Sequence, residues 1–181
     1  MIEYNSFRPK RIKAKIRSDD TMEKQKYSLR TNIGYFLNKP VGFSRDFSIN
    51  YPEVFIEPDL NVVNLASTLR FSRTREGLLL EANVIGQILV TCVNCLSDFL
   101  CEAKTEFEEL YVFAQRSQDD LDMIIPDDGY IDLGVIFREY LLLEIPINAV
   151  CKPDCKGLCP ECGQNLNENM CKHFLDKSDV Q

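Results

Sequence analysis

Five of the chain's eight cysteines lie close together near its C-terminal end, from Cys151 to Cys171. Two residues separate Cys159 from Cys162, which is the spacing of a metal-binding turn. A second Cys-x-x-Cys pair, Cys92 and Cys95, occurs earlier in the sequence. Thiolates at this spacing can hold a tetrahedral ion, so metal binding is the first chemistry that the sequence indicates.

The rest of the sequence favours bound metal over disulfide bonds. Its first residues are polar and lack the apolar core of a secretion signal, which predicts a cytoplasmic location. No apolar stretch reaches the roughly eighteen residues of a membrane span. Thiols stay reduced in the cytoplasm, and closely spaced cysteines pair poorly without strain. We therefore expect zinc at these cysteines.

Two arrangements of the zinc ligands remain open. The rival to a two-site arrangement is a single site that joins Cys92 and Cys95 to Cys159 and Cys162. We favour two structural Zn²⁺ ions because a single site leaves four soft ligands unused. In the two-site arrangement, Cys92, Cys95, Cys151 and Cys155 bind one ion, and Cys159, Cys162, Cys171 and His173 bind the other.

Catalysis finds little support in these residues. A zinc hydrolase or nuclease needs three protein ligands, an open position and a nearby base, whereas these sites look closed and rich in sulfur. The sole histidine, His173, is already assigned to a metal. Cys101 is expected to be a small, buried apolar residue on a strand. We therefore predict that the protein is not an enzyme.

Alternating apolar residues predict the β-strands that position Cys92 and Cys95. The alternation runs from Leu78 to Cys92 and again from Phe99 to Phe107, so these two cysteines fall at the tip of a hairpin. A strand over 65–71 precedes them, with a turn at 75–77, and residues 43–49 predict a further strand that ends before Pro52. Gly86 predicts a bulge or bend in the longest strand.

One helix is predicted after an acidic loop at residues 115–130. It begins after Asp132, a good N-cap, and ends before Pro146. Its apolar stripe is expected to cover the sheet. The predicted fold class is α+β: an antiparallel sheet or partial barrel covered by one helix, with a C-terminal zinc-knuckle segment. The predicted parts are a basic arm over 1–30, a β-rich domain over 31–150, a Cys-rich zinc segment over 151–173 and a tail over 174–181.

Charge is distributed unevenly along the chain. Its net charge is −7, yet residues 1–30 hold nine Lys or Arg and four acids, while the remaining residues hold twelve and twenty-four. Such an arm can contact nucleic acid or can be a solvated tail, and both interpretations remain open. The candidate RNA-binding residues are Arg8, Lys10, Arg11, Lys13, Lys15 and Arg17 in the arm, and Arg70, Arg73 and Arg75 near the 75–77 turn.

Several motifs, taken in order, carry a resemblance to a known family. They are Cys92-Val-Asn-Cys95-Leu, Ile131-Asp-Leu, Glu139-Tyr-Leu-Leu-Leu-Glu-Ile-Pro146 and Cys155-Lys-Gly-Leu-Cys-Pro-Glu-Cys-Gly-Gln-Asn-Leu-Asn167. Together they resemble the YceD family, the large ribosomal RNA subunit accumulation proteins, over about residues 31 to 173. The chain departs from the family at Cys171-x-His173, where many relatives have Cys-x-Cys, a conservative change of ligand.

The resemblance implies a non-enzymatic ribosome biogenesis factor that supports accumulation or processing of large-subunit ribosomal RNA. It brings no catalytic residues. The expected partner is ribosomal RNA or a pre-ribosomal particle, and no membrane. The alternative is a zinc-stabilised protein–protein interaction module whose acidic surface meets a basic partner such as a ribosomal protein.

Overall fold

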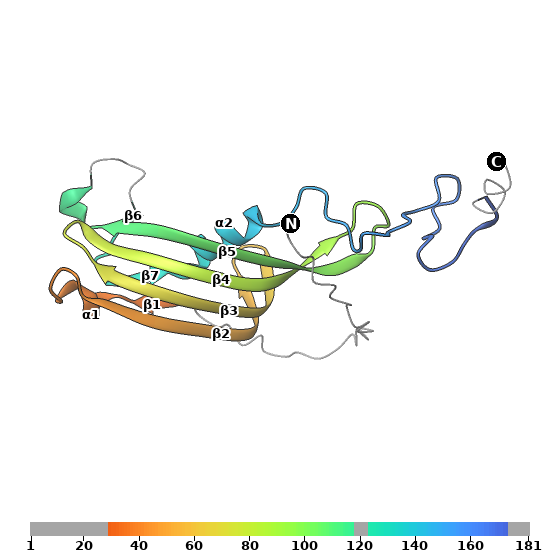
Figure 1. The fold of residues 1–181 in the computed structure, drawn as a ribbon. Helices are drawn as coiled ribbons and strands as arrows, with labels where there is room; N and C mark the ends of the chain where they lie inside the picture. Colours follow the sequence, from red (N-terminus) through yellow and green to blue (C-terminus); the bar gives the residue numbers. More distant parts are fainter. Residues whose placement is uncertain (1–28, 118–122, 174–181) are drawn as a thin grey trace, which may run out of the picture.

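A five-stranded sheet forms the body of the protein in the computed structural model, which describes residues 29–117 and 123–173 (Figure 1). Its strands follow the order β2-β3-β4-β5-β6. The first four pair antiparallel, but β6 pairs parallel to β5. The prediction of an antiparallel sheet is therefore correct for β2 to β5 and wrong for β6. The strands are β2 Ser44–Ile56, β3 Leu60–Arg73, β4 Gly77–Thr91, β5 Asp98–Val112 and β6 Met123–Ile124.

The remaining elements are short, apart from one helix. Strands β1 and β7 pair antiparallel as a separate two-stranded sheet. Neither sheet closes on itself among the described strands, so the partial barrel of the prediction is not confirmed, whereas the α+β composition is. These elements are β1 Arg30–Asn32, α1 Gly34–Leu37, the 3₁₀ turn η1 Ala114–Arg116, β7 Tyr130–Asp132 and α2 Leu133–Leu143.

Two of the sequence predictions need correction. Strand β2 does not stop before Pro52 but continues to Ile56. Pro52 is tolerated because β2 is an edge strand, where a missing N–H need not break a ladder, and Pro52 has no partner in the β2–β3 register. The acidic stretch 115–130 is also not all loop, since β6 lies within it and β7 begins at its end.

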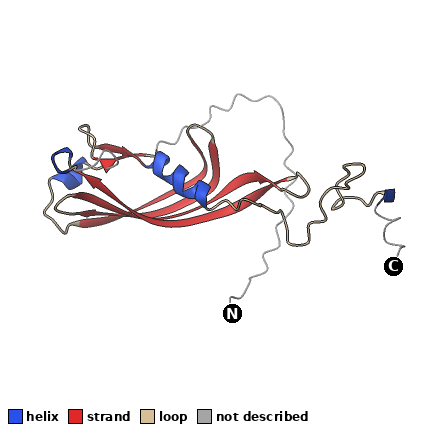
Figure 2. Cartoon of the chain, turned by 90° about the horizontal axis from the view of Figure 1, so that it is seen from above, coloured by secondary structure: helices blue, strands red, loops and turns tan. Residues whose placement is uncertain are grey.

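Helix α2 covers one face of the sheet, as predicted (Figure 2). The carboxylate of Asp132 accepts a hydrogen bond of 2.8 Å from the backbone N–H of Gly134, which caps the helix. The helix packs its apolar stripe on the sheet: the Phe107 ring stacks on Tyr140 at 4.1 Å and meets Phe137 edge-on at 6.2 Å. This packing fixes the strands whose hairpin presents Cys92 and Cys95.

The irregularity predicted at Gly86 is present, but the extra residue lies in the neighbouring strand. Val63 pairs with Gln87 and Ala66 pairs with Ile85, so two residues of β3 face Gly86 alone. One of these two, Asn64, has a φ of 54°. A Cβ on Gly86 would lie 2.4 Å from Cγ1 of Val62, so only glycine fits beside the bulge.

Among the described residues, no helix has the length and apolar character needed to cross a membrane.

Candidate metal centres

Cys92 and Cys95 lie at the tip of the β4–β5 hairpin, where the alternating strands predicted them. The backbone N–H of Leu96 donates to the carbonyl of Cys92 at 3.0 Å, and the N–H of Cys92 donates to the carbonyl of Ser97 at 2.9 Å. Leu96 takes a left-handed conformation with a φ of 55°. This tight turn brings both thiols inward, and both are buried.

The Cys-rich segment docks against that tip through backbone hydrogen bonds. The N–H of Val93 donates to the carbonyl of Ala149 at 3.0 Å, and the N–H of Leu158 donates to the carbonyl of Asn94 at 3.1 Å. Gly157 makes the approach possible, because its φ is +71° and a Cβ would lie 3.0 Å from the Asn94 carbonyl oxygen. Cys151 and Cys155 are therefore held against the hairpin.

The first group of sulfur atoms has the dimensions of a tetrahedral site. The four Sγ atoms of Cys92, Cys95, Cys151 and Cys155 all lie within 4.8 Å of one another. Two of the separations are 3.9 Å, from Cys92 to Cys155, and 3.6 Å, from Cys95 to Cys151. A zinc–sulfur bond of about 2.3 Å in tetrahedral geometry sets the sulfur atoms about 3.8 Å apart. The group could therefore hold a metal ion.

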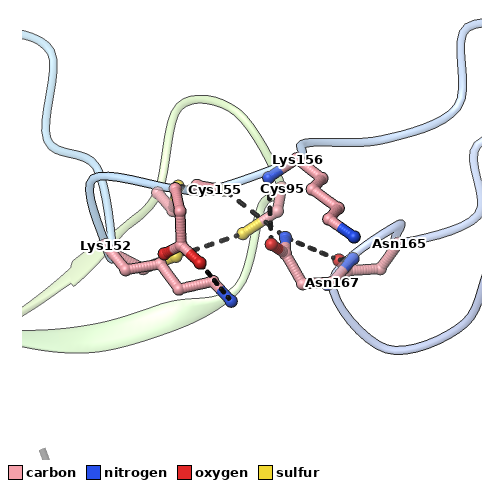
Figure 3. A network of polar contacts seen from close by, with 9 residues as sticks. Cys95, Lys152, Cys155, Lys156, Asn165 and Asn167 are labelled. Carbon is pink, nitrogen blue, oxygen red and sulfur yellow. Dashed lines mark hydrogen bonds and ion pairs between the residues drawn. The ribbon is translucent and has the colours of Figure 1, made fainter.

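An asparagine pair supports this group from the side of the C-terminal segment (Figure 3). The Nδ2 of Asn167 donates to the Sγ of Cys155 at 3.4 Å and to the Oδ1 of Asn165 at 3.0 Å. Asn165 in turn donates to the Oγ of Ser97 at 3.1 Å, which returns the network to the hairpin. Neither asparagine was assigned a role from the sequence, although the Asn-x-Asn pattern shortly after Cys162 was a usable signal.

The second group lies farther along the Cys-rich segment, beyond the hairpin tip (Figure 1). Its members are Cys159, Cys162, Cys171 and His173, whose ligand atoms all lie within 4.8 Å of one another. A tight turn holds the first two, since the N–H of Gly163 donates to the carbonyl of Cys159 at 2.8 Å. Cys159 and Cys171 are buried against Leu166, whereas Cys162 and His173 are exposed. This group could also hold a metal ion.

The groups match the two-site arrangement in membership and differ from the single-site alternative. All eight cysteines lie in the described part of the chain, and all are free thiols. Cys101 is only half-buried, whereas the sequence predicted a buried residue.

The thiol pKa values diverge within each group. Burial opposes ionisation of Cys92, but backbone N–H groups near its sulfur outweigh burial and lower its pKa to about 6. Backbone N–H groups of Cys162 and Glu161 lower the pKa of Cys159 to about 6. Burial and the neighbouring Cys95 sulfur raise the pKa of Cys151 to about 12. In each group, one thiol therefore ionises readily near neutral pH and can bind a cation as a thiolate. In the first group, Cys151 keeps its proton until a bound cation displaces it.

Of the candidate RNA-binding residues, the structure describes Arg70, Arg73 and Arg75, and two of these already have partners. Arg70 forms a 3.5 Å salt bridge with Asp46 on the face of the sheet opposite α2. Arg73 donates to the carbonyls of Thr74 and Gly77 and so holds the β3–β4 turn. Arg75 is exposed in that turn. The six arm residues, Arg8, Lys10, Arg11, Lys13, Lys15 and Arg17, lie outside the described residues.

Comparison with protein families gives a match that spans both groups of metal-binding side chains. The model of the family described as "Large ribosomal RNA subunit accumulation protein YceD" matches residues 80–180, more than half of the chain. The chain belongs to the YceD family. The resemblance inferred from the motifs is thus confirmed, over β4, β5, α2 and the Cys-rich segment.

The chain is also similar to individual proteins, some of which carry the family's name. An uncharacterized protein of Mycobacterium bovis, Mb2951c, is 31% identical over 104 residues, which cover 54% of this chain and 49% of that protein. The chain therefore spans about half the length of that relative. Two proteins named "Large ribosomal RNA subunit accumulation protein YCED homolog 1, chloroplastic" also match. That of Zea mays is 52% identical over 40 residues, which cover 22% of this chain and 14% of that protein. That of Arabidopsis thaliana is 44% identical over 54 residues, which cover 30% of this chain and 17% of that protein. No solved structure matches the chain.

Proposed function

We propose that this YceD-family protein is a non-enzymatic ribosome biogenesis factor that supports accumulation or processing of large-subunit ribosomal RNA. It acts by binding RNA or pre-ribosomal particles. The observation on which this rests is the family match over residues 80–180, whose description names accumulation of large-subunit ribosomal RNA and no reaction. The chloroplastic proteins of maize and Arabidopsis have the same description in their names.

Two structural zinc ions organise the protein in this proposal. The eight ligands are the four cysteines of the first group and the three cysteines and His173 of the second. Zinc suits them better than calcium or magnesium, because sulfur and imidazole are soft or borderline ligands. The 3.6 Å and 3.9 Å sulfur separations in the first group support a closed tetrahedral site. The first ion would join the hairpin to the Cys-rich segment over 151–173, and the second would fold that segment's end.

Closed coordination is also the reason to expect no catalysis. Each group offers four protein ligands, which leaves no position for an activated water. A catalytic zinc would need one of these ligands to be absent. We therefore place the ions in folding and in shaping a binding surface.

Recovery of RNA from growing cells tests the function directly. The tagged full chain is crosslinked in vivo, purified under denaturing conditions, and its attached RNA is sequenced. We expect enrichment of large-subunit ribosomal RNA, including unprocessed ends, over a tagged protein of similar charge. Equal recovery of large-subunit and small-subunit RNA, at the level of that control, would contradict the proposal.

A protein partner is the second candidate, and one surface favours it. The face of the sheet opposite α2 has a hollow of about 570 Å³ that is acidic on balance. Its charged lining residues are Asp46, Glu81, Glu106, Glu108 and Arg70, which pairs with Asp46. Such a surface can attract a basic protein, and a basic partner would be steered to it at low salt. The test is affinity purification of wild type and of Glu81→Gln/Glu108→Gln. A ribosomal protein recovered with wild type and lost with the double variant would favour this candidate.

A further inference from the structure

Lys39 and Arg45 make contacts unlike those of many other basic side chains in the described residues. The Nζ of Lys39 lies 4.3 Å from the centroid of the Tyr35 ring, and the Cζ of Arg45 lies 5.2 Å from that of Phe47. Within residues 29–117 and 123–173, neither forms a salt bridge with an acidic group. Carboxylates instead hold five other cations: Arg30, Arg70, Lys104, Arg138 and Lys152. In an acidic chain, these two charges are open to an anionic ligand.

The ring of Tyr35 is exposed and yet firmly supported. The residue is 49% exposed. Its ring packs edge-on against Phe36 at 5.8 Å and against Phe43 at 5.9 Å. Phe36 is buried and packs on Phe71 at 5.6 Å, so the support reaches the main core. A half-exposed ring held in one orientation loses little entropy when a planar group stacks on it.

These residues lie at the end of the sheet opposite the Cys-rich segment, near α1 (Figure 1). The carbonyl of Phe43 accepts from the N–H of Arg73 at 2.8 Å, which joins this region to the β3–β4 turn. The exposed Arg75 lies in that turn, and the exposed Arg116 lies in η1, whose preceding residue bonds to Glu76. Glu76 is the acid at this turn, so the local charge is positive on a negative body.

We propose that Tyr35, Lys39, Phe43 and Arg45 form a stacking patch that binds single-stranded RNA. A base stacks on the Tyr35 ring in place of the Lys39 ammonium, which lies over that ring in the free protein. The displaced ammonium and the guanidinium of Arg45 then contact the phosphates on either side of the base. This combination of exposed ring and adjacent cations is the chemistry of sequence-tolerant single-strand binding. The proposal rests on the RNA contact in the proposed function and places that contact on described residues.

The test measures binding of the zinc-loaded full chain to a fluorescein-labelled single-stranded RNA of about twelve nucleotides by fluorescence anisotropy. Tyr35→Leu keeps apolar bulk but removes the aromatic face, and should weaken binding about 5-fold or more, as loss of one base stack does. Tyr35→Phe keeps the ring and should bind like wild type. Lys39→Gln/Arg45→Gln should lower the slope of log affinity against log salt by about 1.4, because each lost phosphate contact contributes about 0.7.

The matched control is Lys104→Gln/Lys152→Gln, which removes the same charge from two exposed side chains outside the patch. Zinc content and circular dichroism verify that each variant is folded. If wild type binds RNA and the patch variants lose no more affinity than the control, the patch is excluded while the proposed function stands. If wild type binds pre-ribosomal particles but no free RNA, the patch is also excluded, and a protein contact replaces it. If wild type binds neither, both proposals fail.

Discussion

Asn167 belongs to neither group of metal-binding side chains, but it contacts a ligand of the first group. Its Nδ2 donates to the Sγ of Cys155 at 3.4 Å. Its Oδ1 accepts from the backbone N–H of Lys156 at 2.9 Å. The amide therefore damps the charge of a thiolate and fixes the loop that carries it.

Replacing Asn167 should weaken the first zinc site selectively. We expect Asn167→Ala to lower zinc affinity there about 10-fold or more, the usual effect of removing a hydrogen bond to a ligand. Competition with a chromophoric chelator measures both affinities. Asn169→Ala is the control, because the hydrogen bond of Asn169 to the Asn165 carbonyl comes from its backbone N–H and survives the change. Equal affinities in the two variants would refute the support assigned to Asn167.

The thiol pKa values predict how zinc affinity depends on pH. Because the pKa of Cys151 is raised to about 12, this thiol holds its proton at neutral pH until the metal displaces it. Zinc competes with that proton, so affinity at the first site should fall by at least about tenfold for each unit that the pH drops between about 8 and 6. Below about pH 6, Cys92 protonates as well and the loss at the first site steepens. Cys159 protonates in the same range and weakens the second site. Chelator competition across this range tests the sign; an affinity independent of pH would contradict it.

At the scale of elements, the β3 bulge and Gly86 are adapted to each other. A Cβ at Gly86 would lie 2.4 Å from Cγ1 of Val62, closer than such atoms approach. We expect Gly86→Ala to destabilise the protein by about 1–3 kcal/mol, as overpacking does. Denaturant unfolding of the zinc-loaded protein measures the change in free energy of unfolding.

The double variant Gly86→Ala/Val62→Ala separates a steric clash from the low strand propensity of alanine. Val62→Ala removes the methyl group that Gly86→Ala would meet, at the cost of a cavity. In combination the two changes should cost less than the sum of the single variants, by about 0.5 kcal/mol or more. Strict additivity would show that the close approach is not what requires glycine.

Elements with a strong period were predictable, and short elements were not. From Leu78 to Cys92, buried apolar residues alternate with more exposed ones, because one face of β4 packs on the core and the other faces solvent. The sequence therefore shows a period of two residues there. Asp132 predicted the start of α2 because its side chain caps the helix. Strands β1, β6 and β7 have two or three residues each, too few to show a period, and they form only because distant segments meet. Pro52 misled the prediction because edge position is a property of the whole sheet.

In the candidate site too, the residues set by a local turn were predictable and those set by long-range docking were not. Cys-x-x-Cys spacing reveals ligands because both sulfur atoms come from one local turn, whereas the contacts of Asn165 and Asn167 depend on how the segment docks. The patch around Tyr35 needed the structure as well. Lys39 and Arg45 are ordinary charged residues in the sequence, and only the fold places them beside the exposed ring of Tyr35.

For the whole molecule, the described chain contains two kinds of core. The large apolar core lies between the sheet, α1 and α2, whereas the Cys-rich segment has a small cluster of Cys159, Leu166 and Cys171. The segment therefore has few apolar contacts of its own, and metal binding can supply about 10–16 kcal/mol to such a module. Ordering of the two parts should respond differently to metal removal.

Chelation should uncouple the Cys-rich segment without unfolding the sheet. After treatment with excess EDTA, we expect amide hydrogens of 151–173 and of the hairpin tip at 92–97 to exchange rapidly, while the centres of β3, β4 and β5 stay protected. Hydrogen exchange read by mass spectrometry reports each region, and re-addition of zinc should restore protection. Global loss of protection would show that the sheet, too, depends on metal.

The most direct test of the account is the metal content of the intact, folded chain. Native mass spectrometry of reduced protein, prepared without chelators, should show two zinc ions per chain. Cys92→Ser and Cys159→Ser should each leave one ion, lost from the first and second group respectively. A folded chain that binds one ion or none would contradict the two-site architecture.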